Sequence, residues 1–152
     1  MTAMSAFAID FPGKVREIAT NVAFSPAFST VDVQQDAVVC RAFWDTGANG
    51  SIISTKVVSA LGLKPINMSE VFTANGSYVA SVYVVDVMLP NRFVIPKVTV
   101  TESDLTDCDA LIGMDIITLG DMIVSNNPNT RFSFRIPSEG VAAFTPAHEV
   151  VS

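Results

Sequence analysis

Asp45, Thr46 and Gly47 are the residues of this sequence whose types and order could do chemistry. They follow an apolar run and precede the apolar pair Ile52-Ile53, so Asp45 is expected where a buried strand opens into a loop. A carboxylate at such a place is costly to desolvate unless nearby donors hold it. The hydroxyl of Thr46 is one such donor, and Gly47 lets backbone N–H groups approach without a Cβ in the way. The segment therefore predicts a firmly held carboxylate at the edge of a core.

Asp, Thr and Gly are also common in ordinary turns, each for a local reason. An isolated tripeptide of this kind would be more typical of a turn than of a reactive site. Here apolar runs flank it on both sides, which a surface turn does not require.

Other catalytic arrangements have little support. A Ser-His-Asp or Cys-His arrangement would depend on His148, which lies in a proline-flanked C-terminal segment. One histidine and two cysteines are too few for a zinc site built by the protein, so we expect no metal. Cys40 and Cys108 are expected to be reduced, partly buried core thiols.

Length and composition bound the class of protein. A chain of 152 residues is expected to form one domain. Apolar residues make up 49% and charged residues 16%, with a mean hydropathy of +0.43, which suggests a buried subunit interface. The net charge of −6 argues against nucleic acid as a partner. The longest apolar stretch, Tyr78 to Pro90, is too short to span a membrane, and residues 1–10 do not resemble a signal peptide. We therefore expect a cytoplasmic protein.

The elements expected to position Asp45 are mostly strands. Residues 37–44 predict a strand that leads into Asp45, paired in a hairpin with residues 31–34. Residues 51–54 predict a short strand, followed by a short helix over residues 56–61 that Ser54 or Thr55 caps and Gly62 ends.

A second hairpin is predicted around Asn75-Gly76, because both central positions of a type I′ turn need a positive φ. A purely structural hairpin would have the same sequence. Further strands are predicted over residues 78–89 and 93–100. A buried strand then ends at Gly113, a short helix covers residues 114–119, and last strands lie near residues 123–124 and 131–136.

The sequence resembles the retroviral-type aspartic proteases, the retropepsins. That family has, in order, Asp-Thr-Gly, a hairpin flap, and an apolar-apolar-Gly strand beside the catalytic loop. The corresponding segments here are Asp45-Thr46-Gly47, residues 73–78, and Leu111-Ile112-Gly113, and the match runs from about residue 31 to residue 136. The continuation Gly113-Met114-Asp115-Ile116-Ile117 is closer to the cellular, retrotransposon-like and bacterial members than to the viral enzymes. Two features depart from the viral pattern: Asn49 replaces an acidic residue, and Gly76 is the only glycine of the flap.

The resemblance implies an all-β, closed acid-protease barrel with one or two short helices. The sequence contains no second Asp-Thr/Ser-Gly, which in this family implies a homodimer with one aspartate from each chain. Two carboxyl groups held close together share one proton, so one can activate a water while the other polarises the scissile carbonyl. No metal and no cofactor are needed.

From these observations the sequence predicts three parts: an N-terminal arm over residues 1–14, a protease domain over residues 15–137, and a loosely ordered tail over residues 138–152. The predicted function is that of an aspartic endopeptidase acting on a peptide or protein substrate. Asp45, Thr46 and Gly47 are the predicted catalytic residues, and Leu111, Ile112 and Gly113 are expected to support them. The predicted substrate-binding residues are Ala48, Asn49, Ala74, Asn75 and Gly76. Two alternatives remain open: a binding or assembly module with this fold and little activity, and a regulatory protease that cuts one partner protein.

Overall fold

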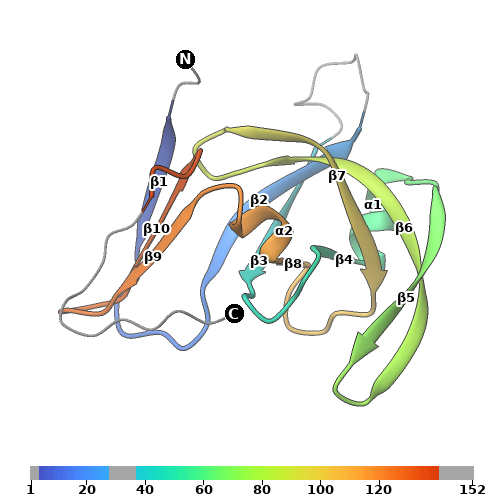
Figure 1. Ribbon diagram of the computed structural model, residues 1–152, viewed down its shortest axis with the longest axis horizontal. Coiled ribbons are helices and arrows are strands. Elements are labelled where there is room, and N and C mark those ends of the chain that lie inside the picture. The colour runs from blue at the N-terminus through green and yellow to red at the C-terminus, as the bar shows by residue number, and fades with distance from the viewer. Residues whose placement is uncertain (1–3, 28–36, 141–152) are drawn as a thin grey trace.

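The computed structural model describes residues 4–27 and 37–140 (Figure 1). These residues form ten strands and two short helices. The elements are β1 (Ser5–Asp10), β2 (Ala19–Pro26), β3 (Val38–Trp44), β4 (Ile52–Ser54), α1 (Thr55–Leu61), β5 (Asn67–Thr73), β6 (Gly76–Met88), β7 (Val94–Ser103), β8 (Ala110–Ile112), α2 (Met114–Ile117), β9 (Asp121–Ser125) and β10 (Arg131–Ile136). The prediction of an all-β protein with one or two short helices is confirmed.

Six of the strands close into a barrel. The larger sheet has the order β2-β3-β8-β4-β7-β6-β5, and an additional pairing joins β2, at one end, to β6, the strand next to the other end. β6 can serve three partners because it is long: its first half pairs with β5, its middle and second half with β7, and its last residues with β2. The β5–β6 hairpin therefore extends from the barrel wall, as Figure 1 shows at its lower right.

The barrel interior is filled by apolar side chains at alternating positions of its strands. On β3 these are Cys40, Ala42 and Trp44, and on β8 they are Ala110 and Ile112. The ladder between these two strands is parallel and pairs Trp44 with Ile112. The last residue of β3 before Asp45 is thus fixed from both its core face and its neighbouring strand.

A second, three-stranded sheet of order β1-β10-β9 packs against the barrel through aromatic rings. The ring centroid of Trp44 lies 4.9 Å from that of Phe132 and 5.0 Å from that of Phe134, and Phe7 of β1 packs on all three rings. The indole N–H of Trp44 donates a 2.9 Å hydrogen bond to the Thr20 hydroxyl, so its polar group is satisfied in the core.

Two parts of the chain differ from the sequence-based expectation. Residues 5–10, expected to belong to a separate arm, form β1 and pair with β10 along its whole length. Phe7, Ile9 and Phe11 alternate with Ala8 and Asp10, a strand pattern that the apolar Ala8 obscures. The strand that leads to Asp45 pairs with β2, whereas residues 31–34, its expected partner, lie outside the described residues.

The second hairpin is present, but its turn is centred one residue earlier than predicted. Thr73 pairs with Gly76, so the two turn residues are Ala74 and Asn75 rather than Asn75 and Gly76. Gly76 has a φ of 129°, which favours glycine, whereas Asn75 is not among the residues with a positive φ. The Thr73 hydroxyl replaces the expected turn geometry by bonding the backbone at both Asn75 and Gly76.

The predicted first helix is confirmed as α1. The Ser54 hydroxyl accepts a hydrogen bond from the Val57 N–H at its start, and Gly62 ends it in the left-handed conformation. The second helix is shorter than predicted, since α2 ends at Ile117 and the chain leaves it through turns at Leu119 and Gly120. None of the helices within residues 4–27 and 37–140 is both long enough and apolar enough to span a membrane.

Candidate active site

Asp45 is the first residue after β3, where the buried strand opens into a loop. Its backbone N–H donates to the carbonyl oxygen of Ile112 at 2.9 Å, and its own carbonyl accepts from the Ala48 N–H at 3.2 Å. One carboxylate oxygen, Oδ1, accepts a 2.8 Å hydrogen bond from the Gly47 N–H. The side chain is half-buried, so this carboxylate is held by the loop and still reaches solvent. The predicted role of Gly47 as a close backbone donor is consistent with this geometry.

The loop lies directly on Gly113. A Cβ built at Gly113 would come within 2.8 Å of the Ala48 carbonyl oxygen and of both the carbonyl carbon and oxygen of Gly50. Real Cβ atoms essentially never approach backbone atoms so closely, so glycine is required by the position of the loop. This explains the Leu111-Ile112-Gly113 pattern. Ile112 is buried in the core, Leu111 lines the space beside the Asp45 loop, and Gly113 leaves room for the backbone of that loop.

Two residues that the sequence did not single out hold the far end of the loop. The Asp115 carboxylate accepts hydrogen bonds from the Ser51 backbone N–H at 3.0 Å and from the Ser51 hydroxyl at 2.7 Å. The Ser51 hydroxyl oxygen in turn accepts from the Gly113 N–H at 3.1 Å. Ser and Asp at these positions look like ordinary helix and turn residues in the sequence, so no local signal marks the pair.

A cleft of about 590 Å³ opens beside the Asp45 carboxylate. Its floor comes from the Asp45 loop and the strands next to it, and one wall comes from the β5–β6 hairpin. Its lining residues are Asp45, Gly47, Ala48, Asn49, Gly50, Ile52, Ser69, Glu70, Val71, Phe72, Thr73, Tyr78, Thr101, Ser103, Leu105 and Leu111. Asp45 and Glu70 are the acidic residues among them, and the rest are apolar or neutral.

The structure brings together most of the predicted site residues. Asp45, Gly47, Ala48, Asn49 and Leu111 line this one cleft. Ile112 and Gly113 lie beneath it, buried.

The hairpin tip, in contrast, does not line the cleft. Ala74, Asn75 and Gly76 are exposed beyond its edge, and the wall is formed by residues 69–73 and Tyr78 instead. Strand alternation could have identified part of this wall, because Ser69, Val71 and Thr73 share one face of β5 with Tyr78 across the ladder.

Thr46 faces a different hollow, on the outer side of the loop. This hollow is lined by Thr46, Met114, Ile117, Gly120, Asp121, Met122, Ile123, Arg135 and Gly140. Thr46 is exposed there next to methionine and isoleucine side chains of α2 and β9. Its predicted catalytic role therefore stays a prediction.

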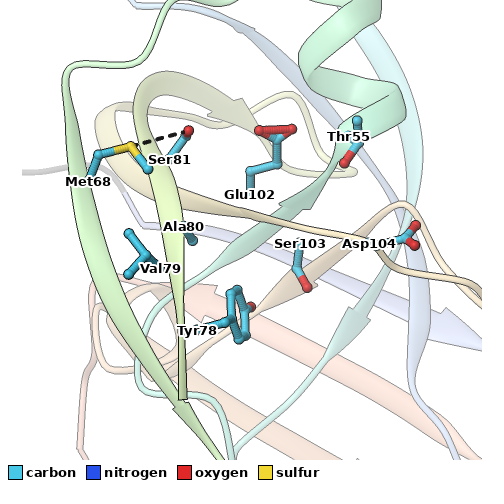
Figure 2. A pocket seen from close by; sticks show the side chains of 9 residues that line it. All are labelled: Thr55, Met68, Tyr78, Val79, Ala80, Ser81, Glu102, Ser103 and Asp104. Atoms are coloured by element: carbon cyan, nitrogen blue, oxygen red, sulfur yellow. Dashed lines mark hydrogen bonds between the residues drawn. The ribbon is translucent and has the colours of Figure 1, made fainter.

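A neighbouring hollow lies beside the cleft, against β6 and the end of β7 (Figure 2). Tyr78 and Ser103 line both, so the two hollows adjoin at these residues. Figure 2 shows Glu102, Asp104 and Thr55 around its other side. The Tyr83 hydroxyl donates to Glu102 Oε1 at 3.0 Å, and burial together with this carboxylate raises the pKa of Tyr83.

No metal centre is built by the described residues: within them, no three histidine, cysteine, aspartate or glutamate side chains gather in a way that could hold a metal ion. Cys40 is a free, buried thiol whose pKa is raised to about 12, chiefly by burial. Cys108 is a free, partly exposed thiol, and burial also raises its pKa. Neither thiol lines the cleft.

Residues 31–118 match the family model described as "gag-polyprotein putative aspartyl protease". The chain belongs to the retropepsin-like aspartic protease family. The fold of this retropepsin-like chain is similar to that of a retropepsin-like aspartic protease from Rickettsia conorii, at 14% identity, a TM-score of 0.57 and coverage of 90% of this chain and 94% of that one. It is also similar to the EIAV protease in complex with the inhibitor HBY-793, at 17% identity, a TM-score of 0.50 and coverage of 67% and 86%. None of the curated proteins compared with the sequence matches it.

Proposed function

We propose that this retropepsin-like protein is an aspartic endopeptidase that hydrolyses peptide bonds with the Asp45 carboxyl groups of two identical chains. The observation that carries this proposal is the placement of Asp45: a carboxylate fixed by Gly47, on a loop seated against Gly113, at the floor of a cleft beside a projecting hairpin. A pure scaffold has no need to hold a carboxylate at the edge of its core, where desolvation disfavours it.

The chemistry requires two carboxyl groups that share one proton. The ionised group takes a proton from a water held between them, and the oxygen of that water attacks the scissile carbonyl. The protonated group donates a hydrogen bond to the carbonyl oxygen as negative charge develops on it. The carboxyl group that took the proton from the water then gives it to the leaving nitrogen as the C–N bond breaks. Asp45 of one chain can fill only one of these two roles.

A second copy is therefore part of the proposal, and the outer side of the Asp45 loop is suited to receive it. Thr46 is exposed there beside Met114 and Met122, and the side chains of Ile123 and Val124 on β9 are 48% and 42% exposed. Among the described residues β9 pairs only with β10. Covering this apolar surface with a second copy would bring the two Asp45 loops toward each other and supply the missing carboxyl group.

The shape of the cleft supports an extended peptide as the substrate. An extended peptide fits between the Asp45 loop and the β5–β6 hairpin, where backbone groups can bond its main chain and alternating side chains enter pockets on either side. Ile52, Val71, Leu105 and Leu111 make those pockets apolar. We therefore expect cleavage between apolar residues of an unstructured segment.

The test is digestion of a peptide library by the purified protein over a range of pH, with the products identified by mass spectrometry. The account predicts cleavage that an aspartic protease inhibitor of the pepstatin type blocks and that Asp45→Asn abolishes. Asp107→Asn is the matched control, because Asp107 is exposed and lines neither the cleft nor the hollows next to it. Absence of cleavage by the wild-type chain, with peptides still bound in the cleft, would favour a binding module with this fold.

A further inference from the structure

Asp115 lies close to the Asp45 loop, and its carboxylate is occupied in a way that the chemistry above does not use. Oδ1 accepts from the Ser51 hydroxyl at 2.7 Å and from the Ile116 N–H at 2.9 Å, and Oδ2 accepts from the Ser51 N–H at 3.0 Å. Asp115 forms no ion pair with any described residue. Three hydrogen-bond donors rather than a cation therefore satisfy this charge.

The backbone of the same residue holds the loop at a second place. The Asp115 N–H donates to the Asn49 carbonyl at 3.1 Å, and the preceding N–H, of Met114, donates to the Ala48 carbonyl at 2.8 Å. Asp115 thus bonds residues 49 and 51 at once, through its main chain and its side chain. Its partner Ser51 is only 2% exposed, so these bonds are shielded from competing water.

Asp115 is not placed to react. It does not line the cleft, and its carboxylate oxygens face Ser51 and the start of α2. The arrangement fixes the distance between the loop of residues 46–50 and Gly113, because the Ser51 hydroxyl hydrogen-bonds both the Asp115 carboxylate and the Gly113 N–H. The loop is fixed at one end by the hydrogen bond from the Asp45 N–H to Ile112 and at the other end by the bonds to Ser51. The Asp45 carboxylate therefore has little freedom to move.

We propose that Asp115 is a positioning residue that, through Ser51, holds the Asp45 loop in the geometry needed for peptide hydrolysis. This inference rests on the proposed function for its catalytic consequence, whereas its structural part stands on the hydrogen bonds alone. The removal of either partner is expected to loosen residues 46–51 without unfolding the barrel, since the core strands β3 and β8 keep their own ladder and packing.

The test compares Asp115→Asn, Ser51→Ala and the double variant with the wild type. Asparagine keeps the shape but has one acceptor oxygen and an NH₂ donor, so it cannot accept both Ser51 bonds in the same way. We expect kcat to fall by about tenfold to a hundredfold while KM changes much less, because a misplaced reacting group costs rate rather than binding. The double variant should be little worse than either single variant, since both break one connection. Ser51→Thr keeps the hydroxyl and should retain most of the rate.

Hydrogen exchange followed by mass spectrometry gives a readout that needs no activity. Asp115→Asn should speed exchange of residues 46–51 by about tenfold or more and leave β1 and β10 unchanged. Asp109→Asn is the matched control: Asp109 Oδ2 also accepts a backbone N–H, from Arg41 at 3.1 Å, but in the middle of β3 and not in the Asp45 loop. It should leave both the exchange of residues 46–51 and kcat unchanged.

The two proposals fail in different ways. Faster exchange of the loop in a protein that cleaves nothing would leave the positioning role in place and overturn the proposed function. Unchanged exchange, or additive losses of kcat in the double variant, would overturn the role of Asp115 whatever the activity of the wild type.

Discussion

The backbone N–H of Asp45 donates a 2.9 Å hydrogen bond to the carbonyl oxygen of Ile112. This bond extends the parallel pairing of β3 with β8 beyond the Trp44–Ile112 pair. It makes one structural unit of two segments far apart in the sequence, the loop that carries the carboxylate and the strand that ends at Gly113. The position of Asp45 is therefore set by the barrel core and not by the loop alone.

Gly113→Ala tests this unit. The added methyl group would press against the backbone of Ala48 and Gly50, so the loop or β8 must shift. We expect the free energy of unfolding to fall by about 1–3 kcal/mol, as for overpacking of a well-packed core. We also expect activity to fall under conditions in which the variant is still folded. Urea unfolding and peptide kinetics measure the two effects. Gly13→Ala is the control, because a Cβ there meets nothing within 4 Å; equal activity in the two variants would contradict the tight seating of the loop.

Gly76→Val tests the role of the β5–β6 hairpin. Gly76 has a φ of 129° and open space around it, so valine is disfavoured by backbone conformation and not by a clash. Since the hairpin extends from the barrel wall, we expect a small change in global stability. If the hairpin closes over the bound peptide, as the proposed function implies, kcat/KM should fall by about tenfold or more. Gly13→Val serves as the control in peptide kinetics. Unchanged turnover would return the hairpin to a purely structural role.

The sequence was sufficient to predict the parts of the site that local patterns define. The Asp45 loop, the apolar strand before Gly113, the capped helix α1 and the existence of the second hairpin all follow from residue types at neighbouring positions. Gly113 in particular could be recognised because a close backbone approach leaves glycine as the only choice.

What the sequence could not predict depends on contacts between distant segments. The pairing of β2 with β6 closes the barrel, yet the sequence of neither strand indicates that the two pair. The partnership of Ser51 with Asp115 likewise arises when β8 places α2 beside the loop. The cleft wall at residues 69–73 could not be read from the Asn-Gly turn signal, because the strand residues that form the wall precede the turn.

Asp121→Asn should change stability in a pH-dependent way. The Ser138 hydroxyl, the Glu139 N–H and the Arg135 guanidinium all bond the Asp121 carboxylate, and together they lower its pKa from 3.8 to about 2. A carboxyl whose pKa is lower in the folded state stabilises the fold above its unfolded pKa, and this contribution is lost as the pH falls through the folded pKa. The stability difference between wild type and variant should therefore be constant above about pH 4 and shrink between about pH 4 and pH 2.

Urea unfolding followed by Trp44 fluorescence at several pH values checks this prediction, since Trp44 is the only tryptophan. A stability difference that stays the same down to pH 2 would show that the charge of Asp121 does not contribute.

The two thiols should differ in reactivity. Cys40 is 2% exposed, and its pKa is raised to about 12, so at neutral pH it is a shielded thiol and not a thiolate. Cys108 is partly exposed, although burial raises its pKa as well. Alkylation at mildly alkaline pH should modify Cys108 slowly and Cys40 only after denaturant is added, as peptide mapping would show. Rapid labelling of Cys40 in the folded protein would contradict its placement in the barrel core.

The central claim is that catalysis needs Asp45 from two chains, and a mixing measurement tests it most directly. Wild-type protein is incubated with increasing amounts of Asp45→Asn protein that carries a different tag, and co-purification of the tags establishes that chains have exchanged. With random exchange, only about a quarter of the dimers in an equal mixture carry two aspartates. The account predicts that activity per wild-type chain falls by about half in that mixture and approaches zero in excess variant. Activity per wild-type chain that stays constant at every ratio would contradict the shared pair of aspartates.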